Sequence, residues 1–447
     1  MKIVLPDKVN NIIMTLQNAG FEAYAVGGCV RDSILGRQPG DWDITTSATP
    51  QETKALFRRT FDTGIEHGTI TVLLDHEGFE VTTYRIDGTY KDSRHPSHVE
   101  FTRSLREDLL RRDFTINAMA YNEEEGLVDI FGGQRDLEEG VIRCVGDARA
   151  RLSEDALRIL RAVRFSAQLG FMVEGGTREA IRELAPTLAN ISAERIQAEL
   201  VKLLISPHPE KMLDLYDMGI TLIIIPEFDR MMTTEQETPH HMYNVGIHTI
   251  EALKHIRAER ILRLTMLFHD IGKPEMKTVD EAGVAHFKMH AGTSEQITGE
   301  VLRRLKFDNN TIGKVTRLVR YHDYRMPPHP NLVRRALNKI GPDLFPYYLE
   351  VRRADTLAQS QYRRAEKLKN IEEITDQYQI IIDQQQCVTI KELKITGRDL
   401  LDLGMKQGAV IGEVLNTFLD EVIEDPDKNK KEQLLKRAQE LIKNSNT

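Results

Sequence analysis

Apolar residues in the N-terminal part of the chain alternate between the spacing of helices and that of strands. Lys8–Ala19 carries them every three or four positions, which predicts an amphipathic helix. The run 23–26 predicts a short buried strand. Two further strands are predicted at Thr69–Leu74 and Glu80–Arg85, joined by a turn at Asp75–Gly78. This part of the chain therefore mixes strands with helices.

From about residue 150 onward the pattern becomes helical, and Glu194–Leu204 is its clearest amphipathic stretch. Residues 230–245 are polar and contain Pro239, which predicts a linker. The rest is again helical, with breaks at 326–328, 341–342 and 383–386. Residues 425–443 predict a charged terminal helix. The sequence thus predicts an α+β fold, in which a head with a mixed sheet and helices precedes all-helical regions.

Composition narrows the class of protein. The chain has 447 residues, of which 40% are hydrophobic and 29% charged, as expected for a soluble globular protein of about three domains. We find no apolar run long enough to span a membrane and no signal peptide at the N-terminus. Three widely separated cysteines fit a reducing cytoplasm. The net charge of −8 does not exclude nucleic acid, because basic residues can gather locally.

Two glycines and two aspartates form the first chemical feature. Gly27-Gly28 follows the predicted strand, and glycines there let backbone N–H groups approach a phosphate. Asp41 and Asp43 flank Trp42, so the alternation of a strand would place both carboxylates on one face. Paired carboxylates suit Mg²⁺, which also binds substrate phosphates during in-line transfer. A turn followed by a surface strand also explains the pattern.

Charged residues recur further along the chain. Arg111-Arg112-Asp113 is either a charged helix start or a pair of guanidinium groups for triphosphate oxygens. A helix through 154–164 would carry one charged stripe: Asp155, Arg158, Arg161 and Arg164. Ion pairs on a solvated helix explain this stripe, and so does base recognition. An aspartate can accept from the amino group of cytosine or adenine while an arginine donates to the neighbouring ring nitrogen. Uracil and guanine present the reversed pattern and would leave groups unpaired.

The order of Gly27-Gly28, Asp41-Trp42-Asp43, Arg111–Ala118 and Glu154–Arg158 resembles the class II tRNA nucleotidyltransferases, the CCA-adding enzymes. The resemblance is close over the N-terminal half and looser toward the C-terminus. It implies template-independent addition and repair of the 3′-terminal CCA of tRNA from CTP and ATP, with release of pyrophosphate. Asp41 and Asp43 would be the catalytic ligands of Mg²⁺.

The same resemblance implies the roles of further residues. The nucleotide would be held by Gly28, Arg31 and Arg112. Asp155 and Arg158 would select the base in place of a nucleic acid template, while Arg161 and Arg164 help to hold the base or the phosphates. The implied partner is the acceptor stem and 3′ end of tRNA, recognised by backbone and shape, and no membrane is involved.

Two segments bear on how many nucleotides are added. Arg85–Pro96 is polar and contains glycine, and it resembles a flexible loop that relatives adding only CC lack. Phe61–Thr69 resembles the CCA-adding branch, because the poly(A) polymerase branch is richer in arginine there. Both favour full CCA addition, and an enzyme that adds only A or only CC is the alternative. A third carboxylate for the metals is not evident: Glu80 is a candidate, but an ordinary strand residue is the simpler interpretation.

A second cluster of candidate ligands lies in the C-terminal half. Its spacing resembles that of the HD phosphohydrolase superfamily, with His248, His269, Asp270 and Asp355. Imidazole and carboxylate ligands suit a transition metal that activates water. His290 and His322 fall where some HD proteins bind a second metal. The glycine expected before His290 is absent, however, which argues against a site for two metals.

Together the two resemblances divide the chain into four domains. They are a nucleotidyltransferase head (1–140), a helical neck with the base-reading motif (141–230), an HD-type helical domain (231–390) and a helical tail (391–447). A protein that is mainly an HD metal-dependent phosphohydrolase with a degenerate head is the alternative from another class. The complete set of catalytic residues in the head argues against it. The sequence does not indicate the oligomeric state.

Overall fold

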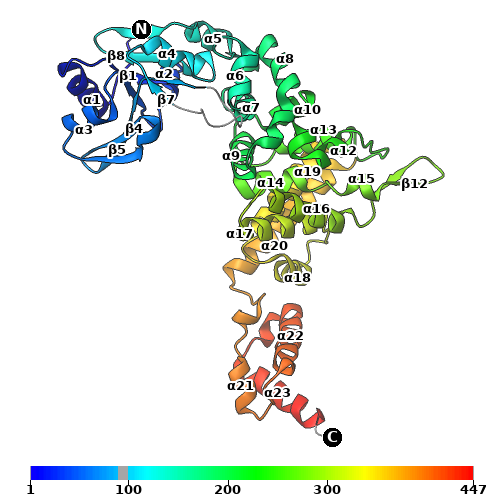
Figure 1. Ribbon diagram of the computed structural model, residues 1–447. Coiled ribbons are helices and arrows are strands. Elements are labelled where there is room, and N and C mark those ends of the chain that lie inside the picture. The colour runs from blue at the N-terminus through cyan, green and yellow to red at the C-terminus, as the bar shows by residue number, and fades with distance from the viewer. Residues whose placement is uncertain (1, 89–98, 446–447) are drawn as a thin grey trace. The chain divides into compact units, whose positions relative to one another are not determined.

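The computed structural model describes residues 2–88 and 99–445. The chain has the expected α+β fold, with strands confined mainly to its N-terminal part and helices elsewhere. It divides into two compact units, Met1–Asp229 and Arg230–Thr447 (Figure 1). Among the described residues, no helix is both long and apolar enough to cross a lipid bilayer.

A seven-stranded sheet in the order β3-β4-β5-β2-β1-β8-β9 forms the centre of the head. In chain order its strands are β1 (Ala23–Val26), β2 (Ile44–Thr46), β3 (Thr60–Gly64), β4 (Thr69–Leu74), β5 (Glu77–Thr83), β8 (Met119–Asn122) and β9 (Gly126–Asp129). β1 is antiparallel to both β2 and β8, whereas β2 and β5 run parallel. The first predicted strand is therefore an inner strand of the sheet, and all four of its residues are buried.

The predicted hairpin is present, with one strand shifted. β4 has the expected bounds, but β5 begins at Glu77 and ends at Thr83. Asp75 and His76 form the two-residue turn, and both have positive φ, 46° and 67°. Such a turn matches the twist of the strands that it joins. Beyond it, β6 (Arg85–Asp87) and β7 (Val99–Phe101) pair as a separate two-stranded ribbon.

Short helices flank the head sheet: α1 (Asp7–Asn18), α2 (Gly28–Ile34), α3 (Pro50–Leu56), α4 (Leu105–Leu110) and α5 (Gly133–Glu139). α1 confirms the predicted amphipathic helix and buries Val9, Ile12, Ile13 and Leu16 at helical spacing. α3 begins with a capping box in which Thr49 and Glu52 bond each other's backbone N–H groups.

The rest of the first unit is helical: α6 (Ala148–Glu154), α7 (Leu157–Leu169), α8 (Gly175–Leu184), α9 (Ala193–Leu204), α10 (Met212–Asp217), α11 (Thr221–Ile224) and α12 (Pro226–Met232), which crosses into the second unit. β10 (Val141–Ile142) and β11 (Met172–Val173) form a small parallel pair. α7 is buried along most of its length and packs on α9. It ends at Gly170, whose φ of 77° suits a glycine at a helix C-terminus.

The second unit consists of helices and one small hairpin, β12 (Thr278–Val279) and β13 (Ala285–His286). Its helices are α13 (Val245–Lys254), α14 (Arg260–Phe268), α15 (Lys273–Met276), α16 (His290–Arg304), α17 (Asn309–Tyr321), α18 (Pro330–Ile340), α19 (Phe345–Ala358), α20 (Arg364–Asp383), α21 (Gly397–Asp402), α22 (Ala409–Glu424) and α23 (Lys431–Ser445). The helices end at the three predicted breaks. α21, α22 and α23 pack around a core of their own that includes Phe418 and Leu434. The four-domain division stays a prediction.

Candidate functional site

Asp41 and Asp43 lie in the segment just before β2, not within the strand as expected. The Asp43 carbonyl accepts a hydrogen bond from Val26 N at 3.0 Å, so the segment is held against the end of β1. Surrounding protein atoms displace water from the Asp43 carboxyl and raise its pKa. Arg112 opposes this shift, and the negative charge of Asp41 adds to it. Two neighbouring carboxylates that repel each other in this way favour a bound cation.

A cavity of about 200 Å³ opens beside Asp43. Its charged lining residues are two carboxylates and three arginines: Asp43, Glu80, Arg85, Arg111 and Arg112. Glu80, from β5, shares the cavity with Asp43, although the sequence favoured an ordinary strand residue at that position. A cavity lined by both carboxylates and guanidinium groups can accept metal ions together with phosphate oxygens.

Arg112 has hydrogen-bonding capacity left for a ligand. Its Nη2 lies 3.3 Å from Asp108 Oδ2, but its buried Nε has no hydrogen-bond partner among the described residues. A Cβ on Gly27, which has a φ of 83°, would stand 3.2 Å from Arg112 Nη1. Gly27 therefore lets the main chain pass close to this guanidinium group. A phosphate oxygen would satisfy the buried Nε–H.

Arg31 and Gly28 lie next to this group, both on α2. Arg31 Nη1 donates to Asn117 Oδ1 at 2.7 Å, and its Nε donates to Asp32 Oδ1 at 2.9 Å. Gly28 is close enough that a Cβ there would lie 3.7 Å from Arg31 Nη2. The structure thus brings Gly28, Arg31 and Arg112 together, as the sequence predicts.

Asp108 is a residue of this site that the sequence reasoning missed. It is fully buried and accepts two hydrogen bonds from Arg111, at 2.9 and 2.7 Å, and one from Thr45 Oγ1. Burial alone would raise its pKa, but Arg111 and Arg112 outweigh burial and lower it. Asp108 therefore stays ionised and orients both arginines. Arg111 and Arg112 follow Asp108 by three and four residues, a spacing that brings side chains together on a helix. This spacing was the signal in the sequence that could have identified Asp108.

Asp113 links the head to α7. Its Oδ2 accepts two hydrogen bonds from Arg161, at 2.8 and 2.6 Å, and its Oδ1 accepts from Phe114 N and Asn117 Nδ2. Burial would raise the pKa of Asp113, but the ion pair with Arg161 and the bond from Asn117 lower it to about 2. Arg161 is thus held by a carboxylate of the same unit.

This pair predicts a pH-dependent contribution to stability. Because the pKa of Asp113 is lower in the folded state, its contribution is complete above the ordinary value of 3.8 and is lost as the pH falls toward 2. The full contribution is roughly 2 kcal/mol. We expect the difference in unfolding free energy between wild type and Asp113→Asn to shrink between pH 5 and pH 3. Urea titrations at each pH measure it, and a constant difference would contradict the assignment.

Asp155 and Arg158 occupy the link between α6 and the first turn of α7. Asp155 precedes α7 in extended conformation, and only the three arginines lie on that helix. Its Oδ2 accepts from Arg195 Nη2 at 2.8 Å and its Oδ1 from Leu157 N at 3.0 Å. Arg158 donates to Glu154 Oε2 at 2.5 Å and to the Arg111 carbonyl at 3.0 Å. The sequence reasoning missed Arg195, which lies in the stretch it identified only as amphipathic.

Arg164 lies in the interior of the first unit. It pairs with Glu199 at 2.5 Å and donates to Gln168 Oε1 at 2.8 Å, so its side chain already has two partners. Its guanidinium carbon stands 3.8 Å from the centre of the Phe165 ring. Those of Arg31 and Arg161 stand 5.1 and 5.4 Å from the same ring. Phe165 thus joins three of the predicted nucleotide-binding arginines through cation–π contacts.

The second unit gathers the four other predicted ligands. His248 Nε2 lies 2.9 Å from Asp355 Oδ1 and 3.4 Å from His269 Nε2. His269 Nε2 lies 3.2 Å from Asp270 Oδ2. Burial would raise the pKa of Asp270, but His269 and Lys273 hold it well below its usual range. Four residues, from α13, α19 and the segment directly after α14, therefore converge with their ligand atoms facing one another.

His290 and His322 join this cluster, which the sequence did not lead us to expect. Their Nε2 atoms are 3.2 Å apart, and each lies 3.4 Å from Asp270 Oδ1. Met289, directly before His290, has a φ of 65°. It adopts the left-handed conformation for which a glycine was expected, so the missing glycine does not exclude His290 from the site.

Comparisons with known proteins agree with the geometry of the head. Residues 23–143 match the model of the Poly A polymerase head domain, and residues 170–232 match a probable RNA and SrmB-binding site of polymerase A. Residues 277–438 match a putative domain 2 of tRNA nucleotidyltransferases. The fold and these matches define a nucleotidyltransferase. They do not show an HD domain, which stays a prediction.

Relatives identify the family. The CCA-adding enzyme of Lactobacillus helveticus is 34% identical over 98% of both chains. That of Leuconostoc mesenteroides is 53% identical over 204 residues, which span 46% of this chain and about half, 51%, of that protein. The structure of the Bacillus stearothermophilus CCA-adding enzyme in complex with CTP matches with a TM-score of 0.72 at 29% identity, over 98% of this chain and 97% of that one. The chain belongs to the family of CCA-adding enzymes.

Proposed function

We propose that this chain builds and repairs the 3′-terminal CCA of tRNA, using CTP and ATP and releasing pyrophosphate. The observation that carries the proposal is the cavity lined by Asp43, Glu80 and the two arginines that directly follow α4, Arg111 and Arg112. A carboxylate pair beside guanidinium groups is what nucleotidyl transfer from a triphosphate requires. Solved structures of family members contain CTP, and another contains tRNA.

Several residues of the head have separate roles in nucleotidyl transfer. Mg²⁺ held by Asp41 and Asp43 would neutralise the triphosphate and lower the pKa of the attacking 3′-hydroxyl. Arg112 offers its unpaired Nε–H to a phosphate oxygen, and Asp108 holds Arg111 and Arg112 in place. Gly27 keeps the backbone free of a side chain beside Arg112, and Gly28 does so beside Arg31. Together these groups fix the leaving pyrophosphate in line with the hydroxyl.

The base is selected by Asp155 and Arg158. Asp155 accepts from the amino group that cytosine and adenine share, and Arg158 donates to the neighbouring ring nitrogen. Uracil and guanine would leave both side chains unpaired. Arg161, held by Asp113, supports the nucleotide from the next turn of α7. Arg164 lies in the interior, where it bonds Glu199 and contacts the Phe165 ring, so its proposed role is to position its neighbours.

Full CCA addition is part of the proposal, and its test uses the ends of the product. The expected flexible loop is Arg85–Pro96, and its residues 89–96 lie outside the described residues. Purified protein is given tRNA lacking CCA, with CTP, ATP and Mg²⁺, and the 3′ ends are sequenced. We expect ends that read CCA. Ends that stop at CC, or A added only to tRNA ending in CC, would instead mark a partial enzyme.

Arg195 is expected to act as a positioning residue for Asp155. Arg195→Gln removes the bond to Asp155 Oδ2, so the carboxylate loses its fixed orientation toward the base. We expect KM for both CTP and ATP to rise about tenfold, with a smaller change in kcat. Arg195→Lys should restore part of the loss. Arg178→Gln is the matched control, because Arg178 has a similar exposure and pairs with Asp214. An unchanged KM in Arg195→Gln would contradict this role.

A second candidate function concerns the other unit. We propose that His248, His269, Asp270 and Asp355 form an HD-type site for a transition metal, which would supply an activated water for phosphate ester hydrolysis. Buried imidazole and carboxylate donors with ionised aspartates fit such a metal. Loss of bound metal in His269→Ala, measured by elemental analysis after dialysis, tests the site.

The protein would work in the cytoplasm, where its three buried cysteines stay reduced.

A further inference from the structure

A buried amide joins two arginines that come from different elements of the first unit. Asn117 is the last residue of a short 3₁₀ turn that begins at Thr115. Its Oδ1 accepts a hydrogen bond from Arg31 Nη1 at 2.7 Å, and its Nδ2 donates to Asp113 Oδ1 at 3.1 Å. The other oxygen of Asp113 accepts two hydrogen bonds from Arg161, at 2.8 and 2.6 Å. A continuous chain of hydrogen bonds therefore runs from α2 through Asn117 to α7.

The partners of Asn117 determine the orientation of its amide. A guanidinium group only donates, so the amide oxygen must face Arg31. Burial would raise the pKa of Asp113, but Arg161 and Asn117 lower it to about 2, so this carboxylate is ionised and only accepts. The amide nitrogen must therefore face Asp113. An aspartate at position 117 would lack the donor and a leucine would lack both groups, whereas an asparagine supplies both.

The turn that carries Asn117 is held by α5 and by the segment that follows it. Thr115 N donates to the Arg143 carbonyl at 2.9 Å, and Thr115 Oγ1 donates to the buried Asp136 Oδ2 at 2.6 Å. A Cβ on Gly133 would lie 2.3 Å from the Thr115 carbonyl, so α5 packs directly on the turn. Asn117 therefore presents its amide from a fixed backbone, as the support of a precise site requires.

The same two arginines also share one aromatic ring. The guanidinium carbons of Arg31 and Arg161 lie 5.1 and 5.4 Å from the centre of the Phe165 ring, within the range of cation–π attraction. Phe114, next to Asp113 in the chain, packs edge-on against this ring, with ring centres 5.8 Å apart and planes at 80°. Phe165 is only 6% exposed, so water weakens these contacts little. The ring and the hydrogen bonds thus connect the two guanidinium groups by separate routes.

The two ends of this connection differ in their access to a ligand. Arg31 pairs with Asp32 at 2.8 Å, and Arg161 pairs with Asp113 at 2.6 Å, so each cation has a carboxylate of its own. The side chain of Arg161 is 34% exposed, whereas that of Arg31 is 10% exposed. A ligand can therefore contact Arg161 from solvent. Because the groups between the two arginines are buried and closely packed, a displacement at one end shifts the other.

We propose that Asn117 and Phe165 are positioning residues for nucleotide transfer. They hold Arg31 and Arg161 as one unit, so that binding of the triphosphate beside α2 and of the base on α7 depend on each other. This rests on the proposed function, in which both arginines hold the nucleotide. A correct base keeps Arg161 in place and, through Asp113 and Asn117, keeps Arg31 directed at the phosphates. A wrong base is penalised in the alignment of the phosphates as well as in its own hydrogen bonds.

The first test measures KM and kcat for incorporation of CMP into tRNA lacking CCA. Asn117→Asp keeps the acceptor for Arg31 but loses the donor to Asp113. We expect KM for CTP to rise about tenfold, because both arginines lose their fixed positions. Partial unfolding would lower kcat and leave KM unchanged, so the rise in KM distinguishes positioning from a purely structural role. An unchanged KM would overturn the proposal.

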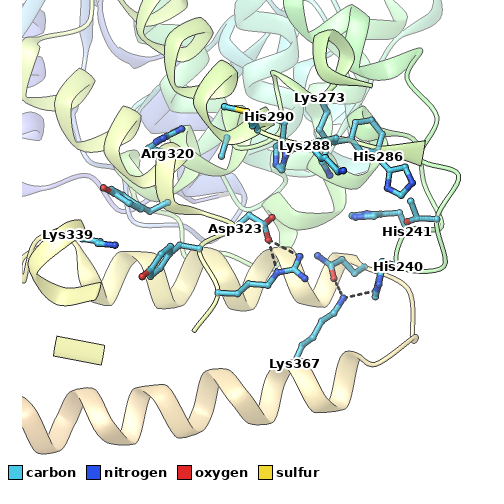
Figure 2. Close-up of a pocket in the computed structure, with 18 residues that line it drawn as sticks. His240, His241, Lys273, His286, Lys288, His290, Arg320, Asp323, Lys339 and Lys367 are labelled. Atoms are coloured by element: carbon cyan, nitrogen blue, oxygen red, sulfur yellow. Dashed lines mark hydrogen bonds and ion pairs between the residues drawn. The ribbon is translucent and has the colours of Figure 1, made fainter. Parts of the chain in front are cut away.

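Two other buried amides serve as matched controls. Asn122, in the same unit, donates to one main-chain carbonyl and accepts from one main-chain N–H. Gln359, in the second unit, accepts from Lys367 and donates to Asp355 (Figure 2), and it is 6% exposed, as is Asn117. We expect KM for CTP to stay within about threefold of wild type in Asn122→Asp and Gln359→Glu. A rise equal to that of Asn117→Asp in either control would overturn the proposal.

The second test changes the charge distribution of the ring and leaves its shape nearly unchanged. Trifluorophenylalanine incorporated at position 165 draws negative charge away from the ring faces that attract the guanidinium groups. We expect KM for CTP to rise about fivefold, without the loss of folding that a smaller side chain could cause. The same replacement of Phe131, whose ring centre lies 5.7 Å from the guanidinium carbon of Arg106, should leave KM unchanged. Equal KM values with the natural and the fluorinated ring at position 165 would overturn the role of Phe165.

The third test shows whether the two arginines act together. Arg31→Gln and Arg161→Gln are made separately and together, in the wild type and in Asn117→Asp. In the wild type, we expect the double substitution to raise KM for CTP about fivefold less than the product of the single effects, because losing either arginine already displaces the other. In Asn117→Asp this difference should shrink to about twofold or less. Effects that multiply in an active wild type would overturn the coupling alone, whereas no CMP incorporation by the wild type would overturn the proposed function.

Discussion

Asp43→Asn is expected to lower kcat for nucleotide addition by about 10³-fold or more. The substitution removes a negative charge from the pair that holds Mg²⁺ and leaves a side chain of the same shape. Asp43 also lines the cavity that contains the arginine pair, so the lost charge lies directly beside the proposed triphosphate site. Asp41→Asn should have a similar effect. Incorporation of radiolabelled CMP into tRNA lacking CCA, under single-turnover conditions, measures it.

The control is Asp62→Asn, because Asp62 is an exposed carboxylate of the same sheet that pairs with Lys54 at 2.9 Å. It should retain nearly full activity. Binding of tRNA by the Asp43→Asn variant should also be unchanged. Addition at more than a tenth of the wild-type rate by either aspartate variant would show that the metal ligands have been misassigned.

Asp155→Asn is expected to relax the choice of base. Asparagine keeps one acceptor but adds a donor, so it no longer favours the amino group of cytosine and adenine over the carbonyl of uracil. We expect kcat/KM for CTP and ATP to fall about 100-fold, because a charge-assisted hydrogen bond to a buried base is lost. The ratio of UTP to CTP incorporation should rise about tenfold. Competition between labelled nucleotides on one tRNA measures the ratio.

Asp214→Asn provides a closely matched control. Asp214 and Asp155 have equally exposed side chains, 18% each, and both pair with an arginine of the same unit. It should change neither the rate nor the choice of nucleotide. An equal fall for all four nucleotides in Asp155→Asn, without a change in their ratio, would mean that Asp155 supports the fold of the site and does not read the base.

Local signals in the sequence were sufficient for most of the secondary structure. The proline and glycine breaks near 327 and 341 separate helices as expected. α1 differs from its predicted range by one residue at each end, and α9 differs by one residue at its start. The strand β5 was placed three residues too late, because Gly78 was taken as part of the turn. The turn is formed by Asp75 and His76 in left-handed conformations, which non-glycine residues seldom adopt.

The sequence indicated candidate site residues but not the contacts that hold them. Motif spacing singled out Asp41, Asp43 and Arg112 as candidates, because each belongs to a short segment. The partners that orient these groups come from distant elements: Arg195 reaches Asp155 across 40 positions, and Glu199 reaches Arg164 across 35. Such pairs depend on the packing of α7 on α9, which periodicity does not fix. A second metal at His290 was not expected, because no glycine precedes that residue. Met289 nevertheless adopts a left-handed conformation at that position.

The ion pairs of α7 also carry an evolutionary consequence. Arg161 and Arg164 each pair with one buried carboxylate, Asp113 and Glu199, so losing either arginine leaves a buried carboxylate without its ion pair. A lineage can therefore exchange these residues only through near-simultaneous changes at both positions. Across descendants of a common ancestor, we expect each pair to be inherited or replaced as a unit, and drift at one position alone to be rare.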